Sequence, residues 1–515
     1  MPVVSRPISE PSFLQINKFP PEILAQIFLF CLPSKPSGLS NRTAPINLIW
    51  VCGFWRDLAV NTPELWASLE LARVRGCFPD VNALLGGWAD LSRNRPMSLT
   101  YNFPSDHEAQ STVLLPSLIP LAPRLRELNF TIRPDNYVPL LMALSRRGLP
   151  LLESLTLSGY ITVGTSFFQG PQYMNLSSCG SLHTLSIESI PITPQSTYNV
   201  SNTWFATILV PWRQITCLRI IDSTLNATEV VEVLVMCDAL EECELLTGCA
   251  RYNHTTQITT PIVLPHLKRL TLRSDDIDTR NGVTYILNSL TLPALKTLSL
   301  STEQIPSNLF TPSLLSLHRR EQFLLQELSL TGDFDIKGLI VLLREFSMLK
   351  HLALKLSNLS VYPRLFRFLA TRTSEISPLP LPHLVSLDLL IHAPGVCIDA
   401  AGHPTYLTTA LHVLQDGVDR CDYWGQTAPR TYSILTMLKN RFQQSESAKN
   451  SATTGVARLE HVTLRTLRSR RNWGNGSGWQ HKGQEWIYPT NRAQALQEEE
   501  FQRGLILEFP VQLFE

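Results

Sequence analysis

The sequence predicts an α/β protein in which a small N-terminal unit of three helices is followed by an irregular solenoid, with short parallel strands on its concave face and helices on its convex face. Three observations predict this architecture. A short leucine pattern recurs along most of the chain, and three proline-led helical patterns precede it. The chain has 515 residues, more than one compact core usually takes, and only 17% of them are charged, so a well-buried repeat structure is expected.

The first predicted helix follows a tail, residues 1–15, that contains three prolines and is expected to be disordered. Proline fits the first helical turn, so the helix should begin at Pro20 and Pro21 and end before Pro33. The segment FPPEILAQIFLFCLP is apolar on nearly every side. It is too short to span a membrane and has no broad polar face. We therefore expect it to pack on its own domain with one side and on another protein with the other.

Two more helices are expected in the same unit. One is opened by Pro45, and its apolar residues recur at three- and four-residue steps: Leu48, Val51, Trp55 and Leu58. The other begins at Thr62 and Pro63, where threonine can cap and proline can take the first helical position. Together these helices predict a small domain over residues 16–71.

The segments FPPEILAQIF, VCGFWRDLA and NTPELWASLEL resemble the F-box, in particular the F-box-like form of large fungal families with a C-terminal repeat region. The resemblance implies docking on a Skp-type adaptor, which links the F-box to a cullin scaffold and a RING ubiquitin-ligase core. Carried onto this chain, it places Phe28 and Leu58 in the core. The expected adaptor-binding residues are Pro20, Pro21, Ile23, Leu24, Ile27 and Leu48, with Trp55 as an anchor. The insertion at residues 34–44 departs from the family pattern.

The repeat begins clearly after residue 95, with hexapeptides such as LRELNF, LKTLSL and LKHLAL. Their first residues are 24 to 35 residues apart, with one final gap of 75: Leu125, Leu152, Leu182, Ile215, Leu240, Leu267, Leu295, Leu325, Leu349, Leu384 and Leu459. Each alternating L-x-L predicts a short strand with one buried face, and segments such as 228–237 and 337–346 predict returning helices. The spacing of Leu69, Leu99 and Leu128 suggests that the phase starts within the helical unit.

This pattern resembles the leucine-rich repeat and assigns residues 72–515 to one solenoid. The period is irregular, and the asparagine or cysteine that usually follows L-x-L is missing. Insertions are expected near 393–456 and 465–490, and a last strand at Leu505–Phe509. The second insertion combines arginines and tryptophans that could bind an acidic peptide or single-stranded nucleic acid: Arg468, Arg470, Arg471 and Trp473. The alternative, which we favour, is a flap whose tryptophans pack on the solenoid.

Several function classes are disfavoured by the residue pattern. The ten cysteines form no C-x-x-C pair, and no zinc, phosphate-loop or nucleophile motif is present, so neither an enzyme nor a metal or cofactor site is expected. Lys plus Arg (44) nearly balances Asp plus Glu (43), which argues against nucleic-acid and membrane partners. With no apparent secretory signal, a cytoplasmic or nuclear location is expected, and an extracellular leucine-rich receptor is disfavoured.

The sequence therefore predicts a non-catalytic substrate receptor of a cullin-RING ubiquitin ligase of the SCF type, with the adaptor on the F-box and an unidentified protein substrate on the solenoid. The alternative is an interaction scaffold that does not promote ubiquitination.

Overall fold

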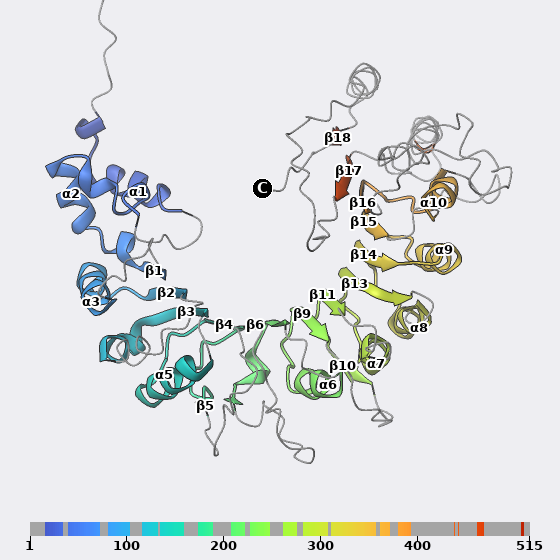
Figure 1. Ribbon diagram of the computed structural model, residues 1–515, viewed down its shortest axis with the longest axis horizontal. Helices are drawn as coiled ribbons and strands as arrows, with labels where there is room; N and C mark the ends of the chain where they lie inside the picture. The colour runs from blue at the N-terminus through green and yellow to red at the C-terminus, as the bar shows by residue number, and fades with distance from the viewer. Residues whose placement is uncertain are drawn as a thin grey trace, which may run out of the picture. The chain divides into compact units, whose positions relative to one another are not determined.

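The computed structural model describes most of the chain up to residue 392 and short pieces beyond it (Figure 1). The described residues are 16–33, 40–72, 81–102, 116–131, 134–158, 174–188, 208–221, 227–247, 261–274, 282–306, 311–356, 361–370, 380–392, 437, 441, 461–467 and 506–508. The chain divides into two compact units, Met1–Pro211 and Trp212–Glu515. The predicted α/β class is confirmed, because both units build parallel sheets with helices between the strands.

The first unit begins with a group of short helices, which we call the helical module (residues 16–66). Its elements are η1 (Ile16–Lys18), α1 (Pro21–Phe30), η2 (Leu48–Trp50), α2 (Gly53–Val60) and η3 (Pro63–Trp66). Pro21 lies in the first turn of α1. A proline has no backbone N–H group, and this costs nothing there because first-turn N–H groups have no acceptor within the helix. The first helix thus begins and ends close to where the prolines predict.

The second and third helices differ from their predictions. The prediction of one continuous helix from Pro45 to Leu58 is wrong. The elements η2 and α2 are separated at Cys52, whose φ of −161° and ψ of 171° are those of an extended backbone. The Arg56 Nε donates to the Ile49 carbonyl at 3.1 Å across this break. The third helix is a 3-10 turn, η3, and Thr62 Oγ1 donates to the Leu58 carbonyl at 2.8 Å instead of capping that turn.

The remainder of the first unit is a parallel sheet with its strands in chain order. These strands are β1 (Ser68–Ala72), β2 (Met97–Asn102), β3 (Leu125–Thr131), β4 (Ser154–Ser158) and β6 (Thr184–Glu188). The connections contain α3 (Val81–Ser92), η4 (Ile119–Arg124) and α5 (Pro134–Arg147), while β5 (Met174–Asn175) pairs with β7 (Ile208–Leu209). Leu69 lies opposite Leu99, and Leu99 opposite Leu128, so the leucine phase predicted from these residues is confirmed.

The second unit repeats the same strand-and-helix order. Its strands are β8 (Cys217–Ile221), β9 (Glu242–Thr247), β11 (Arg269–Ser274), β13 (Thr297–Pro306), β14 (Glu327–Asp333), β15 (His351–Leu356), β16 (Ser386–His392), β17 (His461–Leu467) and β18 (Ile506–Glu508). Its helices are η6 (Trp212–Gln214), α6 (Ala227–Val235), α7 (Gly282–Ser289), α8 (Thr311–Glu321), α9 (Ile336–Glu345) and α10 (Val361–Ala370), and β10 (Ile262–Val263) pairs with β12 (Leu290–Thr291). Within this unit the strands lie on one side and the helices on the other (Figure 1).

Each predicted L-x-L segment is a strand, and the helices predicted at 228–237 and 337–346 appear as α6 and α9. The last predicted strand is β18. The N-terminal tail and nearly all of both predicted insertions lie outside the described residues.

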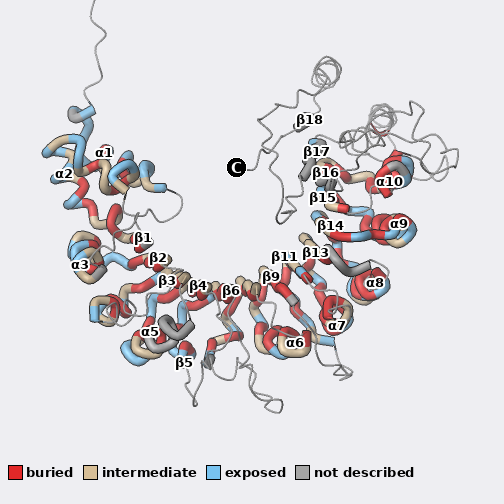
Figure 2. The backbone as a smooth tube through the Cα atoms, viewed as in Figure 1, coloured by how far each residue is buried: buried red, intermediate tan, exposed pale blue. Residues whose placement is uncertain are grey.

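The core lies between the sheet and the helices and is built mainly from the strand leucines (Figure 2). In β15 the exposed His351 is followed by buried Leu352, half-buried Ala353 and buried Leu354, as the two-residue period of a strand requires. Leu298 and Leu328 are opposite each other in register and both are buried. Leucines of successive strands therefore stack in rows, and each repeat buries its apolar side against its neighbours.

One hydrogen-bond arrangement recurs at the start of the strands in the second unit. A single backbone carbonyl accepts bonds from two successive N–H groups of the next repeat. The Lys268 carbonyl, for example, accepts from the Lys296 and Thr297 N–H groups at 2.9 and 3.0 Å. The same arrangement is made by the carbonyls of Thr216, Glu241, Lys296, Gln326 and Lys350. We call these six groups the shared carbonyls.

Arginines also join neighbouring repeats through backbone carbonyls. Arg320 Nη2 donates to the Leu287 and Leu290 carbonyls at 2.8 and 2.7 Å. Arg441 is buried and donates to three carbonyls, those of Leu369, Pro380 and Leu381. Burial lowers the pKa of Arg441 to about 10, which still leaves the guanidinium charged at neutral pH. Each arginine thus binds backbone carbonyls at least 30 residues away in the chain.

The burial pattern predicts unequal effects of two substitutions only two residues apart. Leu298→Ala should lower the free energy of unfolding by about 2 to 5 kcal/mol, because the side chain is fully buried and leaves a cavity. Lys296→Ala should change it by no more than about 0.5 kcal/mol, because Lys296 is exposed. Urea denaturation of the full chain measures both, and equal sensitivity at the two positions would contradict the assigned strand phase.

Candidate docking and binding surfaces

The helix α1 has apolar residues on two faces, of which one is buried. Leu24 and Phe28, four residues apart, are buried inside the helical module. Ile23, Ile27 and Phe30 follow the same helical spacing on another face, and Ile23 and Phe30 are 49% and 87% exposed. The module therefore has a core of its own and a second apolar surface that this core does not use.

Further exposed apolar residues lie on the elements after α1. Trp50, at the end of η2, is 70% exposed, and Val51 and Phe54 next to it are exposed as well. Large exposed apolar side chains on a small domain that has its own core are candidates for an interaction surface. We call these six residues the apolar module surface: Ile23, Ile27, Phe30, Trp50, Val51 and Phe54.

The seven predicted adaptor-binding residues divide into three groups in the structure. Pro20, Pro21, Ile23 and Ile27 are exposed, as docking requires. Trp55 is half-buried, and its ring lies 4.7 Å from the ring of Phe28, so it packs between α1 and α2.

The other two predicted residues, Leu24 and Leu48, are buried at 0% and 4% exposure. They belong to the module's own core and form no part of its exposed surface. Phe28 lies in that core as expected, while Leu58 is half-buried. Four exposed apolar residues were not among the predicted docking residues: Phe30, Trp50, Val51 and Phe54. The sequence feature that could have identified them is the run of large apolar side chains with few polar neighbours.

Two tryptophans join the helical module to the first repeat of the same unit. The Trp66 and Trp88 rings meet edge to face with centroids 4.9 Å apart. The Trp66 Nε1 donates to the Ala59 carbonyl at 2.8 Å, and the Trp88 Nε1 donates to the Ser68 carbonyl at 3.1 Å. An ion pair between Arg95 and Glu64 adds a further link. The module is therefore held against α3 and β1 by packing as well as by the chain.

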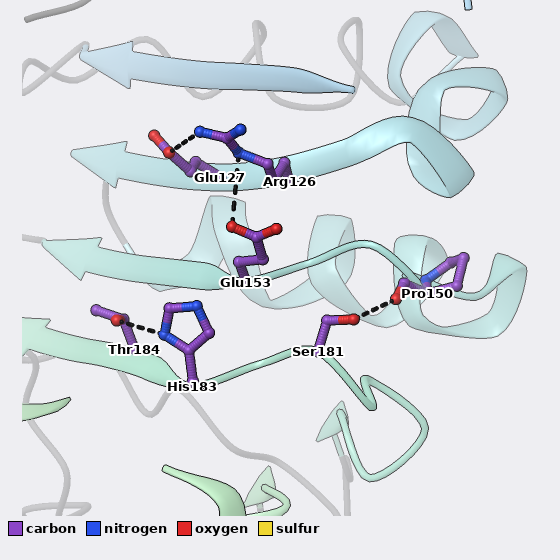
Figure 3. Close-up of polar contacts among 7 residues, drawn as sticks. All are labelled: Arg126, Glu127, Pro150, Glu153, Ser181, His183 and Thr184. Carbon is purple, nitrogen blue, oxygen red and sulfur yellow. Dashed lines mark hydrogen bonds and ion pairs between the residues drawn. The ribbon is translucent and has the colours of Figure 1, made fainter. Parts of the chain in front are cut away.

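The strand face of the first unit carries polar residues at the strand starts (Figure 3). Arg126 lies between two carboxylates, 3.0 Å from Glu127 Oε1 and 3.6 Å from Glu153 Oε2. The hydrogen bond with Glu127 raises the pKa of Arg126. At the start of β6, His183 Nδ1 is 3.1 Å from Thr184 Oγ1. These side chains are wholly or partly exposed, so the face offers charges and hydroxyls rather than an apolar patch.

The second unit carries a denser set of ion pairs on its strand face. Glu244 on β9 contacts Arg219 on β8 at 2.9 Å and Arg273 on β11 at 2.6 Å. One step along the strands, Lys268 Nζ is 2.7 Å from Glu241 Oε2, and Arg269 pairs with Glu242. Each of these pairs joins neighbouring strands. Glu244 of β9 is thus engaged by cations from both neighbouring strands.

The predicted substrate-contacting residues Arg468, Arg470, Arg471 and Trp473 lie outside the described residues, because β17 ends at Leu467. Whether that segment is a recognition loop or a packed flap therefore stays a prediction.

Three of the described cysteines, Cys179, Cys237 and Cys243, are buried, whereas Cys31 is exposed. Burial raises the pKa of Cys179 to about 11 and that of Cys237 to about 12, so both thiols are protonated at neutral pH. In the described ranges, no three His, Cys, Asp or Glu side chains gather as a metal site would require. Among the helices that the structure describes, none has the length and apolar character needed to cross a bilayer.

Comparison with known proteins adds no relative: no protein-family model matches this chain, and neither does any curated protein.

Proposed function

We propose that this chain is a non-catalytic substrate receptor of a cullin-RING ubiquitin ligase of the SCF type. In this proposal the helical module is an F-box that docks on a Skp-type adaptor, and the repeats form a leucine-rich solenoid whose strand face holds a protein substrate. The observation that carries the proposal is the apolar module surface. A domain of this size that already has a core has no folding reason to expose Ile23, Phe30 and Trp50 together.

The repeat architecture supports the second half of the proposal. Parallel strands follow one another at the period of the leucine pattern, and their outward positions carry charged and hydroxyl side chains. Surfaces built in this way are extended and can contact a partner over several repeats. Outward residues such as Arg126, Glu244 and Lys350 differ from one repeat to the next, which gives the face a varied pattern of charge.

The chemistry in this proposal belongs to the partner complex. Holding a substrate lysine near a charged conjugating enzyme converts a bimolecular encounter into an effectively intramolecular one. The receptor has only to bind and to orient, which needs no nucleophile, metal or cofactor of its own. A cytoplasmic or nuclear location, where such ligases act, is part of the same proposal.

The proposal predicts that the full-length tagged chain captures both a Skp-type adaptor and a cullin from cell extract. Because the cullin contacts the chain through the adaptor, capture of cullin should be lost when the apolar module surface is altered. Adaptor without cullin would instead indicate the alternative function, a scaffold that does not promote ubiquitination. Failure to capture either protein would exclude both functions.

A further inference from the structure

The second unit contains a column of three lysines and one glutamine in successive repeats. The residues Lys268, Lys296, Gln326 and Lys350 stand at the same place in four successive repeats. Their backbones are joined directly: Lys296 N–H donates to the Lys268 carbonyl at 2.9 Å, Gln326 N–H to the Lys296 carbonyl at 2.8 Å, and Lys350 N–H to the Gln326 carbonyl at 2.7 Å. We call these four residues the lysine column.

The members of the lysine column differ in whether a carboxylate engages them. Lys268 is paired with Glu241 at 2.7 Å. Lys296 and Lys350 are exposed, and among the described residues neither ammonium group has an ion pair. The neighbouring carboxylate, Glu327, accepts a hydrogen bond from Thr297 Oγ1 at 3.2 Å. Two positive charges therefore remain available to a ligand on this face.

The surroundings of these two lysines would accommodate a chain rather than a single ion. Adjacent strands are about 4.8 Å apart, so two steps place the backbones of Lys296 and Lys350 about 10 Å apart. The strand residues directly after the column are Thr297, Glu327 and His351, and the next outward row is small and half-buried: Ser299, Ser329 and Ala353. Gln326, between the lysines, can both donate to and accept from a peptide backbone.

We propose that the lysine column binds an acidic segment of the protein substrate, in an extended conformation, with carboxylates directed at Lys296 and Lys350. Alternate side chains of an extended segment are roughly 7 Å apart, a spacing that flexible lysine side chains can meet. Nucleic acid is the less suitable partner, because its affinity depends on many phosphate contacts and this column offers two lysines without an ion pair among the described residues. This inference rests on the proposed function, of which it names the substrate class.

The test uses the full chain and two fluorescent peptides of equal length, one with glutamate and one with glutamine at every second position. We expect the glutamate peptide to bind more tightly, and its affinity to fall as salt is added. Reversing both charges, Lys296→Glu with Lys350→Glu, should weaken its binding by roughly tenfold or more. Fluorescence anisotropy measures each affinity.

Two controls separate charge from fold. Lys296→Arg with Lys350→Arg keeps the charges and should retain binding. Lys337→Glu, a single charge reversal at an exposed position of α9, should leave binding unchanged. Equal binding of both peptides, no loss in the reversed variant, or tighter binding of single-stranded DNA would overturn the inference. If no peptide binds while adaptor and cullin are still captured, this inference fails and the proposed function stands.

Discussion

Capture of the Skp-type adaptor is expected to be abolished by Ile23→Asp combined with Ile27→Asp. Both side chains are exposed on one face of α1, so the aspartates should leave the core formed by Leu24 and Phe28 intact. Truncating one interface anchor costs about 2 kcal/mol or more. Two losses of this size correspond to a decrease in affinity of roughly a thousandfold. Co-precipitation of the adaptor with the tagged full chain measures the loss.

A matched control for this variant lies in the second unit. Val235→Asp with Val263→Asp also places two charges on exposed apolar positions, far along the chain from the module. This control should capture the adaptor as the unaltered chain does. Circular dichroism and thermal denaturation should show both variants to be folded. Undiminished adaptor capture by the Ile23 and Ile27 variant would remove the docking assignment, and with it the main support for the F-box proposal.

The second large effect is expected at the junction between the helical module and the first repeat. Trp66→Ala should lower the free energy of unfolding of this region by about 3 to 5 kcal/mol, the usual cost of removing a buried aromatic side chain. Trp66 is 3% exposed, and the substitution also removes its contact with Trp88 and its hydrogen bond to the Ala59 carbonyl. Hydrogen exchange in β1 and β2 measures the effect locally.

Two further tryptophan variants make this prediction specific. Trp50→Ala removes an equally large side chain that is mostly exposed, and it should change stability by no more than about 0.5 kcal/mol. Trp66→Phe keeps most of the packing and loses the indole N–H, so its effect should lie between the other two. If Trp66→Ala lowered the free energy of unfolding no more than Trp50→Ala does, the packing of Trp66 would not hold the junction together.

The strands were predictable because each carries its own signal. In LKTLSL the leucines alternate with polar residues, and such a hexapeptide recurs every 24 to 35 residues along most of the chain. The pairing of Ser386 with His461 shows that the pattern holds even across the longest gap, since β16 and β17 are neighbours although Leu384 and Leu459 are 75 residues apart. Local periodicity was therefore sufficient to predict the strands of the sheet.

The module's inner and outer faces were less predictable, because α1 is apolar nearly all round. The helical period places Leu24 and Ile23 on different faces of α1, but it does not indicate which of the two faces is buried. The break at Cys52 was hidden for a related reason: the spacing of Leu48, Val51 and Trp55 fits a continuous helix as well as two short ones. Only tertiary packing decides between these possibilities.

The ion pairs of the strand face could not be predicted from local sequence either. Glu244 meets Arg219 and Arg273, which are 25 and 29 residues away, and these contacts depend on the register between repeats. An irregular period leaves that register open until the structure is known.

The shared carbonyls give the second unit a direction of assembly. Each acceptor belongs to the earlier repeat, and its two N–H donors belong to the later one, as at Gln326 with Lys350 and His351. A repeat that emerges during synthesis therefore finds its acceptor already in place. Removing repeats from the C-terminal end leaves an exposed carbonyl, whereas removing them from the N-terminal end leaves two N–H groups without an acceptor. The unit should consequently grow and unravel at its C-terminal end.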